Sequence, residues 1–219
     1  LSSGGSGDTS IMTGLGVYMG MKSCAKEAWG KESLTGKTVA LQGFGKVATY
    51  TAHHLMKEDA KLVVTDVFDD ALDRARDMGL TVVKPDDIYC VDCDIFAPCA
   101  LGGVLNTETI PQLKCKVVAG GANNQLLSAT DGEELHRLGI VYGPDYIMNS
   151  GGIINAEAEI GRAYNSDRAR EKTERIYETM DRVIAISKVE EITTGEAADR
   201  LAEDRLKSVR GIRKIYRSN

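Results

Sequence analysis

The chain has 219 residues, of which 42% are hydrophobic and 27% charged, a composition typical of an ordinary folded globular protein. Its net charge of −5 at pH 7 lacks the basic footprint of a nucleic-acid-binding surface. No apolar run approaches the about 18 residues of a membrane-spanning helix, and no signal-peptide pattern is visible. We therefore expect a cytoplasmic protein that binds neither nucleic acid nor membrane.

The stretch 1–10 opens with small, glycine-rich residues and is predicted to be a hinge and connector. Good N-cap residues stand at its end, and the apolar residues that follow at helical spacing predict a helix as far as about Gly30. Thr13 lies in the first turn of this helix. From there its side chain can reach into a cleft beside the hinge.

A β-branched and apolar run at 38–42 leads directly into a G-x-G-x-x-A turn and a helical pattern. In a dinucleotide-binding unit the first glycine permits the tight bend, the second lets a pyrophosphate approach the backbone, and the alanine lets the helix pack on the strand. The helix start adds unpaired N–H groups and a partial positive charge. A plain connecting turn is the alternative. The residues of this predicted phosphate site are Gly43, Phe44, Gly45, Lys46, Val47 and Ala48.

A second apolar run ends in Asp66, close to the spacing of about 20 residues at which a carboxylate accepts hydrogen bonds from the ribose hydroxyls. The alternative is a cap for the next helix. A 2′-phosphate about 4 Å from an ionised carboxylate is repelled by about 4 kcal/mol per unit charge at an effective dielectric constant of about 20. Residues 67–70 add no Arg or Lys to offset this repulsion. The sequence therefore predicts NAD rather than NADP.

Strand and helix patterns alternate from here on. Strands are predicted at 81–83, 93–97, 116–119 and 140–142, and helices at 69–78, 107–113 and 131–138. This alternation predicts an α/β fold with a doubly wound parallel sheet of the Rossmann type, formed by residues 11–150. Ligands of such sheets lie beyond the carboxyl ends of the strands, where small or polar turns recur at 97–100 and 120–124. We expect the cofactor cleft there.

Cys90 and Cys93 have the spacing of a redox or zinc site. A zinc site needs two more ligands at matching spacing, and none of the three histidines pairs with these cysteines, so no metal site is predicted. Five cysteines are an odd number in a chain too large to need disulfides. This count favours a reducing compartment.

The segment 149–155, NSGGIIN, breaks the alternation. Its two glycines are either a tight turn or a place where the backbone approaches a ligand, with Asn149 and Asn155 as amide donors. Helical patterns follow, and residues 151–219 are expected to complete the same domain and pack on the sheet. Their two predicted core stripes are Ile176, Met180, Val183, Ile184 and Ser187, then Ala198, Leu201, Ala202, Leu206 and Val209.

From Gly5 to about Arg210 the chain resembles the cofactor-binding domain of the amino-acid dehydrogenases that act on glutamate, leucine, phenylalanine and valine. The leucine and phenylalanine members are the most similar. The stretches that carry the resemblance, in the family's order, are GGSGDTSIMTGLGVYMGMK, LQGFGKVA, VVTD, CDIFAPCALGG, AGGANNQL and GIVYGPDYIMNSGGIINAEAE. The resemblance implies NAD-dependent oxidative deamination of a branched-chain or aromatic L-amino acid to a 2-oxo acid and ammonium.

By this resemblance, the turn at 43–48 holds the pyrophosphate and Asp66 holds the adenosine ribose. The residues implied on the nicotinamide side are Thr13, Ala97, Cys99, and Asn123 or Asn124, with Asn149 at the junction of cofactor and substrate. Ile153 and Ala156 are implied to face the substrate side chain. Ala156 stands where leucine-specific members usually carry a larger aliphatic residue, which implies a roomier pocket.

The family's catalytic lysine and aspartate lie in an N-terminal substrate domain, and no matching segment is present in this sequence. Hydride transfer from an amine-bearing carbon needs a positioned base and a charge partner for the developing imine. We therefore expect no catalytic residue in this chain, which would bind NAD and share the amino-acid substrate with the missing domain.

The full-length protein is expected to be a homo-oligomer. One alternative is a catalytically inert NAD-binding module or sensor. A hydroxy-acid dehydrogenase, a third interpretation, needs an Arg and His pair beside the nicotinamide, and the position of His136 does not suit that role.

Overall fold

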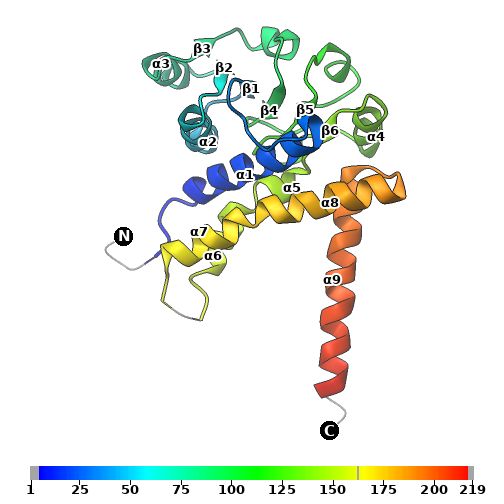
Figure 1. Ribbon diagram of the computed structural model, residues 1–219. Helices are drawn as coiled ribbons and strands as arrows, with labels where there is room; N and C mark the ends of the chain where they lie inside the picture. Colours follow the sequence, from blue (N-terminus) through cyan, green and yellow to red (C-terminus); the bar gives the residue numbers. More distant parts are fainter. Residues whose placement is uncertain (1–4, 162, 217–219) are drawn as a thin grey trace.

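The computed structural model describes residues 5–161 and 163–216, and for residues 210–216 it describes only the backbone. Residues 1–4 of the predicted hinge lie outside the described residues. The described part contains a six-stranded, all-parallel sheet with the order β3-β2-β1-β4-β5-β6 (Figure 1). The strands are β1 (Thr38–Gln42), β2 (Lys61–Thr65), β3 (Thr81–Val82), β4 (Ile95–Pro98), β5 (Val117–Val118) and β6 (Val141–Tyr142). The predicted doubly wound parallel sheet is confirmed.

Helices precede, connect and follow the strands. They are α1 (Ser10–Trp29), α2 (Lys46–Lys57), α3 (Asp69–Asp77), α4 (Ala129–Arg137), α5 (Asp145–Met148), α6 (Gly151–Glu157), α7 (Ser166–Glu174), α8 (Ile176–Glu190) and α9 (Thr194–Tyr216), with the 3-10 turns η1 (Asp86–Cys90) and η2 (Ile110–Gln112). The helix predicted at 107–113 is wrong: only η2 forms, because so short a segment with Pro111 at its centre does not sustain an α-helix. The turn η1 has no counterpart among the predicted elements.

Alternate residues of the strands face two separate cores, as the pleat of a strand requires. Val39 and Leu41 of β1 pack with α1, α2 and α8 on one face. Ala40 of β1 and Phe96 of β4 pack with η1, η2 and α4 on the other face. Because both faces are covered, β4 and the interior of β1 are apolar.

Helix α1 lies between the sheet and the C-terminal helices (Figure 1). Glycines make this close packing possible. A Cβ atom on Gly14 would lie 2.6 Å from the Cβ atom of Tyr50 in α2, and one on Gly16 would lie 2.7 Å from Cδ1 of Ile176 in α8. Gly30 ends the helix in the left-handed conformation, with φ +72°, as predicted from the sequence.

The buried face of α2 is narrow. Ala48, Thr51, Ala52 and Leu55 are buried at the i, i+3, i+4 and i+7 positions of one helical face. Met56 is 37% exposed, because one residue beyond Leu55 the helix has turned by about 100°.

The predicted stripe on α8 is buried, mainly against α1. Helix α9 behaves differently: Ala197 and Ala198 in its first turns are buried, and the rest projects away from the body of the molecule (Figure 1). Ala202, Leu206 and Val209, predicted as core, are exposed, Leu206 by 57%. That part of the prediction is wrong, because no other described element lies beside this half of the helix.

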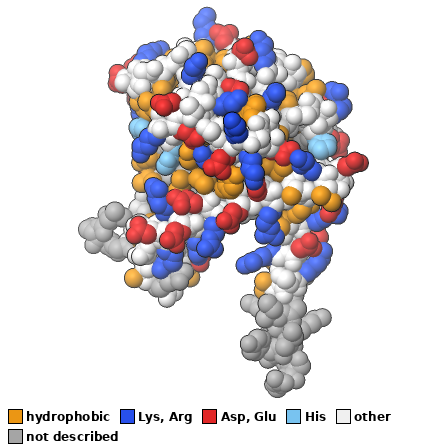
Figure 2. Space-filling model, viewed as in Figure 1, with side chains coloured by type: hydrophobic (Ala, Val, Ile, Leu, Met, Phe, Trp, Pro, Cys, Tyr) orange, Lys and Arg blue, Asp and Glu red, His pale blue; other side chains and the backbone are white. Residues whose placement is uncertain are grey.

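Charged side chains of both signs are interspersed over the face shown in Figure 2. Two ion pairs join α1 to α8: Lys26 Nζ lies 2.7 Å from Asp181, and Lys188 Nζ lies 2.8 Å from Glu27. Exposed pairs of this kind contribute about 1 kcal/mol or less each, so the buried stripe of α8 holds the two helices together.

None of the described helices combines the length and apolar character needed to cross a bilayer.

Candidate functional site

The turn after β1 is built around Gly43, whose φ of +93° suits glycine alone among common residues. A Cβ atom here would lie 2.7 Å from the Cβ atom of Ala100, in the segment that leaves β4. The Gly43 N–H donates to the carbonyl of Thr65 at the end of β2, at 2.8 Å. Gly43 therefore joins the carboxyl ends of three neighbouring strands.

Gly45 precedes α2 and has different surroundings. It is exposed, and a Cβ atom at this position would have no heavy atom within 4 Å. It occupies the N-cap position of α2 without a side-chain cap, so the space around the first turn of the helix is open. The neighbouring side chains point elsewhere: Phe44 and Ala48 are buried, and Lys46 pairs with Asp8 at 3.2 Å. This is the geometry in which helix N-termini bind anions.

The carboxylate of Asp66 ties the end of β2 to this turn. Its Oδ2 accepts from the N–H of Phe44 at 2.6 Å, and its Oδ1 accepts from the N–H groups of Val67 and Phe68 at 2.7 and 3.0 Å. Asp66 does not cap α3, whose N-cap is Phe68. A carboxylate has about four acceptor sites, two on each oxygen, so Oδ2 can still accept one more hydrogen bond.

Arg74 also reaches the turn, and the sequence pattern does not single it out. Its Nη2 donates to the carbonyl of Phe44 at 2.7 Å, and its guanidinium carbon lies 5.8 Å from the centre of the Phe44 ring. Arg74 comes from α3, the helix that follows the end of β2.

Three asparagines meet at the exits of β5 and β6. Nδ2 of Asn149 donates to Oδ1 of Asn123 at 2.6 Å and to the carbonyl of Gly121 at 3.4 Å. The N–H of Asn124, which has φ +51°, donates to Oδ2 of Asp145 at 2.6 Å. Asp145 was not among the predicted site residues, although it fixes the loop that carries Asn123.

The remaining predicted residues on this side differ in exposure. Ala97 is fully buried in β4, its backbone included. Cys99 is partly buried, and burial raises the pKa of its thiol to about 11, which keeps the thiol neutral at pH 7. Oγ1 of Thr13 donates to the carbonyl of Thr9 at 3.0 Å.

Gly151 and Gly152 let α6 begin directly against α1. A Cβ atom on Gly151 would lie 2.1 Å from the carbonyl oxygen of Met12, and one on Gly152 would lie 2.8 Å from Oγ1 of Thr13. The glycine pair thus has a structural reason that neither sequence interpretation included, namely close packing of two helices. As a result, α1, which carries Thr13, packs directly against the start of α6, two residues after Asn149.

The outward face of α6 carries the residues implied to contact substrate. Ile153 is 74% exposed, and Ala156 is exposed. Asn155, predicted as an amide donor to a ligand, is 1% exposed and its Oδ1 accepts from the hydroxyl of Tyr164 at 2.8 Å. That role of Asn155 is wrong, because its amide is used inside the protein.

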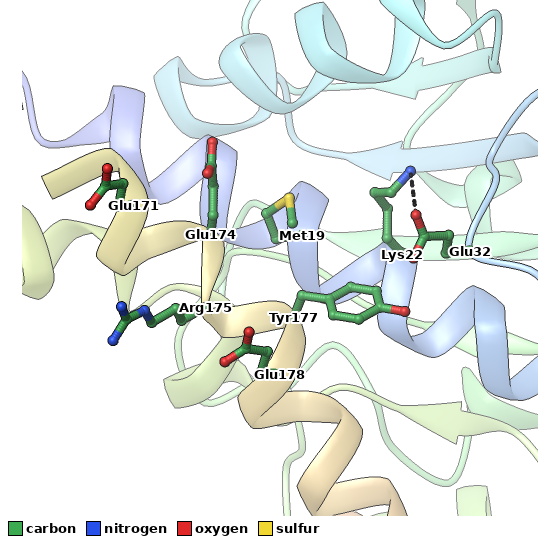
Figure 3. A pocket seen from close by; sticks show the side chains of 8 residues that line it. All are labelled: Met19, Lys22, Glu32, Glu171, Glu174, Arg175, Tyr177 and Glu178. Carbon is green, nitrogen blue, oxygen red and sulfur yellow. Dashed lines mark ion pairs between the residues drawn. The ribbon is translucent and has the colours of Figure 1, made fainter. Parts of the chain in front are cut away.

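A separate hollow of about 420 Å³ lies between α1, α7 and α8 (Figure 3). It is lined by Met19, Lys22, Glu32, Glu171, Glu174, Arg175, Tyr177 and Glu178. Its carboxylates outnumber its cations, so it would repel a pyrophosphate, and it contains none of the predicted cofactor residues.

Among the described residues, no group of three or more His, Cys, Asp and Glu side chains is placed to hold a metal ion.

The sheet order, the glycine turn after β1 and the carboxylate at the end of β2 together define a Rossmann-type α/β domain. The chain matches the model of the Glutamate/Leucine/Phenylalanine/Valine dehydrogenase family over residues 4–67 and 69–208. It belongs to this family of amino-acid dehydrogenases, as the resemblance in the sequence implies.

The comparisons with individual proteins agree with this assignment. The chain is 51% identical over 217 residues to the leucine dehydrogenase of Geobacillus stearothermophilus, covering 99% of this chain and 59% of that protein. It is 43% identical over 207 residues to the L-tryptophan dehydrogenase of Nostoc punctiforme, covering 92% and 57%. The chain therefore spans about three fifths of the length of the curated relatives it matches.

Solved structures give the same result for the fold. The crystal structure of L-tryptophan dehydrogenase from Nostoc punctiforme matches with a TM-score of 0.88 at 42% identity, over 92% of this chain and 62% of that chain. The hetero-hexameric glutamate dehydrogenase from Thermus thermophilus matches with a TM-score of 0.79 at 22% identity, over 97% and 55%. The second likeness concerns the fold alone.

Proposed function

We propose that this chain is the NAD-binding part of an L-amino-acid dehydrogenase that converts a branched-chain or aromatic amino acid to a 2-oxo acid and ammonium. The observation that carries the proposal is the hydrogen bond between Asp66 and the N–H of Phe44. It sets a carboxylate beside a glycine turn whose helix start is open. Family membership supports the type of reaction.

In this proposal the amides of residues 43–48 and the start of α2 hold the pyrophosphate, and Asp66 accepts from the adenosine ribose. The fit rests on the open space around Gly45 and on the spare acceptor capacity of Asp66. Bound NAD supplies the hydride acceptor. The protein's own contribution is to orient the cofactor and to hold charge partners at fixed positions.

The nicotinamide side is assigned to Thr13, Cys99, Asn123 and Asn149, beside the end of β4 that contains Ala97. Of the two adjacent asparagines, Asn123 is favoured because its side chain is bonded to Asn149. The neutral Cys99 thiol adds no charge beside the nicotinamide. The substrate side chain is assigned to the exposed apolar surface of Ile153 and Ala156, which suits a branched-chain or aromatic group.

The domain assignment is part of the same proposal. Residues 11–150 form the cofactor-binding unit, and residues 151–219 complete it, which the packing of α7 and α8 on α1 supports. Proton transfer from the substrate amine requires a base that we assign to the family's other domain. This chain by itself is therefore expected to bind NAD without catalysing deamination.

The cofactor preference is assigned to Asp66, whose carboxylate repels a 2′-phosphate. Arg74 donates to the neutral carbonyl of Phe44, so it keeps its positive charge and reduces that repulsion. We expect calorimetric titration to give at least about tenfold tighter binding of NAD than of NADP, a difference of about 1.4 kcal/mol. Equal affinities would remove Asp66 from this role.

Substitution of Asp66 tests the proposal directly. Asp66→Asn replaces charge-assisted hydrogen bonds with neutral ones, so NAD affinity should fall by about tenfold or more, and the difference between NAD and NADP should narrow. Asp69→Asn, in the exposed first turn of α3, is the matched control and should leave both affinities unchanged. Calorimetry on both variants measures the effect, and an unchanged NAD affinity in Asp66→Asn would contradict the proposal.

A second experiment separates the enzyme from an inert NAD-binding module. A longer chain that joins this sequence to the family's substrate domain should form NADH when leucine, valine, phenylalanine or tryptophan is added with NAD. A longer chain that binds NAD but forms no NADH with any of these amino acids would favour the module.

A further inference from the structure

Two buried cysteines stand side by side at the amino end of the sheet, away from the cofactor edge. Cys93 lies two residues before β4, and Cys115 lies two residues before β5. Ile95 pairs with Val117 in this parallel pair of strands, so the same register places Cys93 opposite Cys115. The pairing continues toward these cysteines, because the N–H of Lys116 donates to the carbonyl of Asp94 at 3.1 Å.

The spacing of the two cysteines suits a disulfide. Neighbouring strands lie about 4.8 Å apart, and disulfides join residues whose Cα atoms lie about 4.4–6.8 Å apart. The two thiols are also close enough for each to shift the pKa of the other. A bond between the two sulfur atoms therefore requires little movement of the backbone.

Both cysteines also lie beside surface hollows. Cys93 and Cys115 are 7% and 6% exposed, and each contributes to the wall of its own hollow of about 400 Å³. Charges of both signs line these hollows: Lys114, Lys116, Asp92 and Asp94 beside Cys93, and Lys116 and Glu27 beside Cys115. A small molecule can therefore approach either cysteine from the solvent.

The two thiols differ in acidity. The hydrogen bond from Cys93 lowers the pKa of Cys115. The same hydrogen bond, together with burial, raises the pKa of Cys93. Cys115 is therefore the first of the pair to form the nucleophilic thiolate, while Cys93 keeps its proton.

We propose that Cys93 and Cys115 are a redox-active pair that a small disulfide, such as oxidised glutathione, converts into a disulfide joining the segments that lead into β4 and β5. The Cys115 thiolate attacks one sulfur of the oxidant, which forms a mixed disulfide and releases one thiolate. That thiolate takes the proton of Cys93. The Cys93 sulfur then attacks Cys115 Sγ and releases the second thiolate, which takes a proton from solvent.

The electrons and protons balance. The two protein thiols lose two electrons and two protons in total, counting the proton that Cys115 gives up when it ionises. The oxidant gains both electrons and leaves as two thiols. No metal or further co-reactant takes part.

The other cysteines provide contrasts within the same chain. Cys90 is exposed on η1, and its thiol donates to Gln112 Oε1 at 3.4 Å rather than to Cys93. The C-x-x-C spacing of the sequence therefore points to the wrong partner for Cys93. Cys24 is fully buried in α1, and Cys99 lies at the cofactor edge.

Mapping the oxidised protein tests the proposal. The folded chain is incubated with oxidised glutathione, its free thiols are blocked with N-ethylmaleimide, and a digest is sequenced by mass spectrometry. We expect a Cys93–Cys115 link and a loss of two free thiols per chain. We also expect a higher urea midpoint, because the link closes a loop in the unfolded chain. A Cys90–Cys93 link, a stable glutathione adduct on the wild-type pair, or no reaction in the folded protein would overturn the proposal.

Variants separate the roles of the two sulfurs. Cys93→Ala should accumulate the mixed disulfide on Cys115, because the resolving thiol is absent, and Cys115→Ala should slow glutathione addition at Cys93 at least tenfold. Cys90→Ala is the matched control and should form the link at the wild-type rate; loss of the link in this control would overturn the proposal. The link mapped in the wild-type chain remains decisive if either buried variant folds poorly.

Discussion

Gly43 and Gly45 share one turn but are glycine for different reasons, and alanine substitutions should separate those reasons. In Gly43→Ala, the φ of +93° and the collision with Ala100 should lower the free energy of unfolding by about 1–3 kcal/mol. In Gly45→Ala, the added methyl meets no atom, so stability should fall by about 1 kcal/mol at most. The same methyl would stand where the pyrophosphate approaches, so NAD affinity should fall at least about tenfold.

Urea unfolding and calorimetry measure the two effects separately. Trp29, the single tryptophan of the chain, supplies a fluorescence signal for unfolding. Equal losses of stability in the two variants would contradict the structural difference between Gly43 and Gly45. An unchanged NAD affinity in Gly45→Ala would contradict the assigned phosphate site.

His54 makes the stability of the chain depend on pH. It is partly buried and stacks on Tyr18 with 5.2 Å between ring centres. Burial, followed by the charges of Lys57, Arg170 and His53, lowers the pKa of His54. The unfolded chain therefore binds more protons, so the free energy of unfolding should fall as pH drops below about 6.5, until the folded pKa is passed.

His54→Gln should flatten this part of the pH profile, because it removes the titrating group. His53→Gln changes an exposed neighbour on the same helix and is the control. Urea midpoints measured between about pH 4 and 8 give the profile. The cause assigned to His54 would be wrong if the profile of His54→Gln kept the slope of the wild type.

At the scale of elements, α8 and α9 carry similar apolar stripes with different surroundings. Met180 of α8 is fully buried, whereas Leu206 of α9 is 57% exposed. Met180→Ala should lower the free energy of unfolding by about 2–5 kcal/mol. Leu206→Ala should change it by about 0.5 kcal/mol or less. Urea unfolding of this chain measures both, and a large loss in Leu206→Ala would show that α9 packs in solution.

Helical periodicity predicts which face of a helix is apolar, and on α8 that face is buried as predicted. It does not show whether another element covers the face, because that depends on where the helix is held. The role of Gly151 and Gly152 also depends on a distant segment. The two glycines are needed because α1, far away in the sequence, packs against them.

At the scale of the whole molecule, a ligand that binds only the folded chain raises the free energy of unfolding of the whole cooperative unit. NAD at about 100 times its dissociation constant should raise the free energy of unfolding by about 2.7 kcal/mol. Trp29 is a suitable reporter, because it lies at the amino end of the sheet, with Lys37 Nζ 3.9 Å from its ring centre. No shift of the urea midpoint at saturating NAD would show that the cofactor does not bind the native fold.

The sequence by itself determined the parallel sheet, the glycine turn, the position of Asp66 and the family, because each depends on local spacing along the chain. Only the tertiary structure decided that Arg74 reaches the turn, that Asn155 is used internally, that Cys93 faces Cys115 rather than Cys90, and that α9 projects. The physical reason is the same in each case. These outcomes depend on contacts between segments far apart in the chain, and such contacts exist only after the sheet and α1 have fixed where each segment lies.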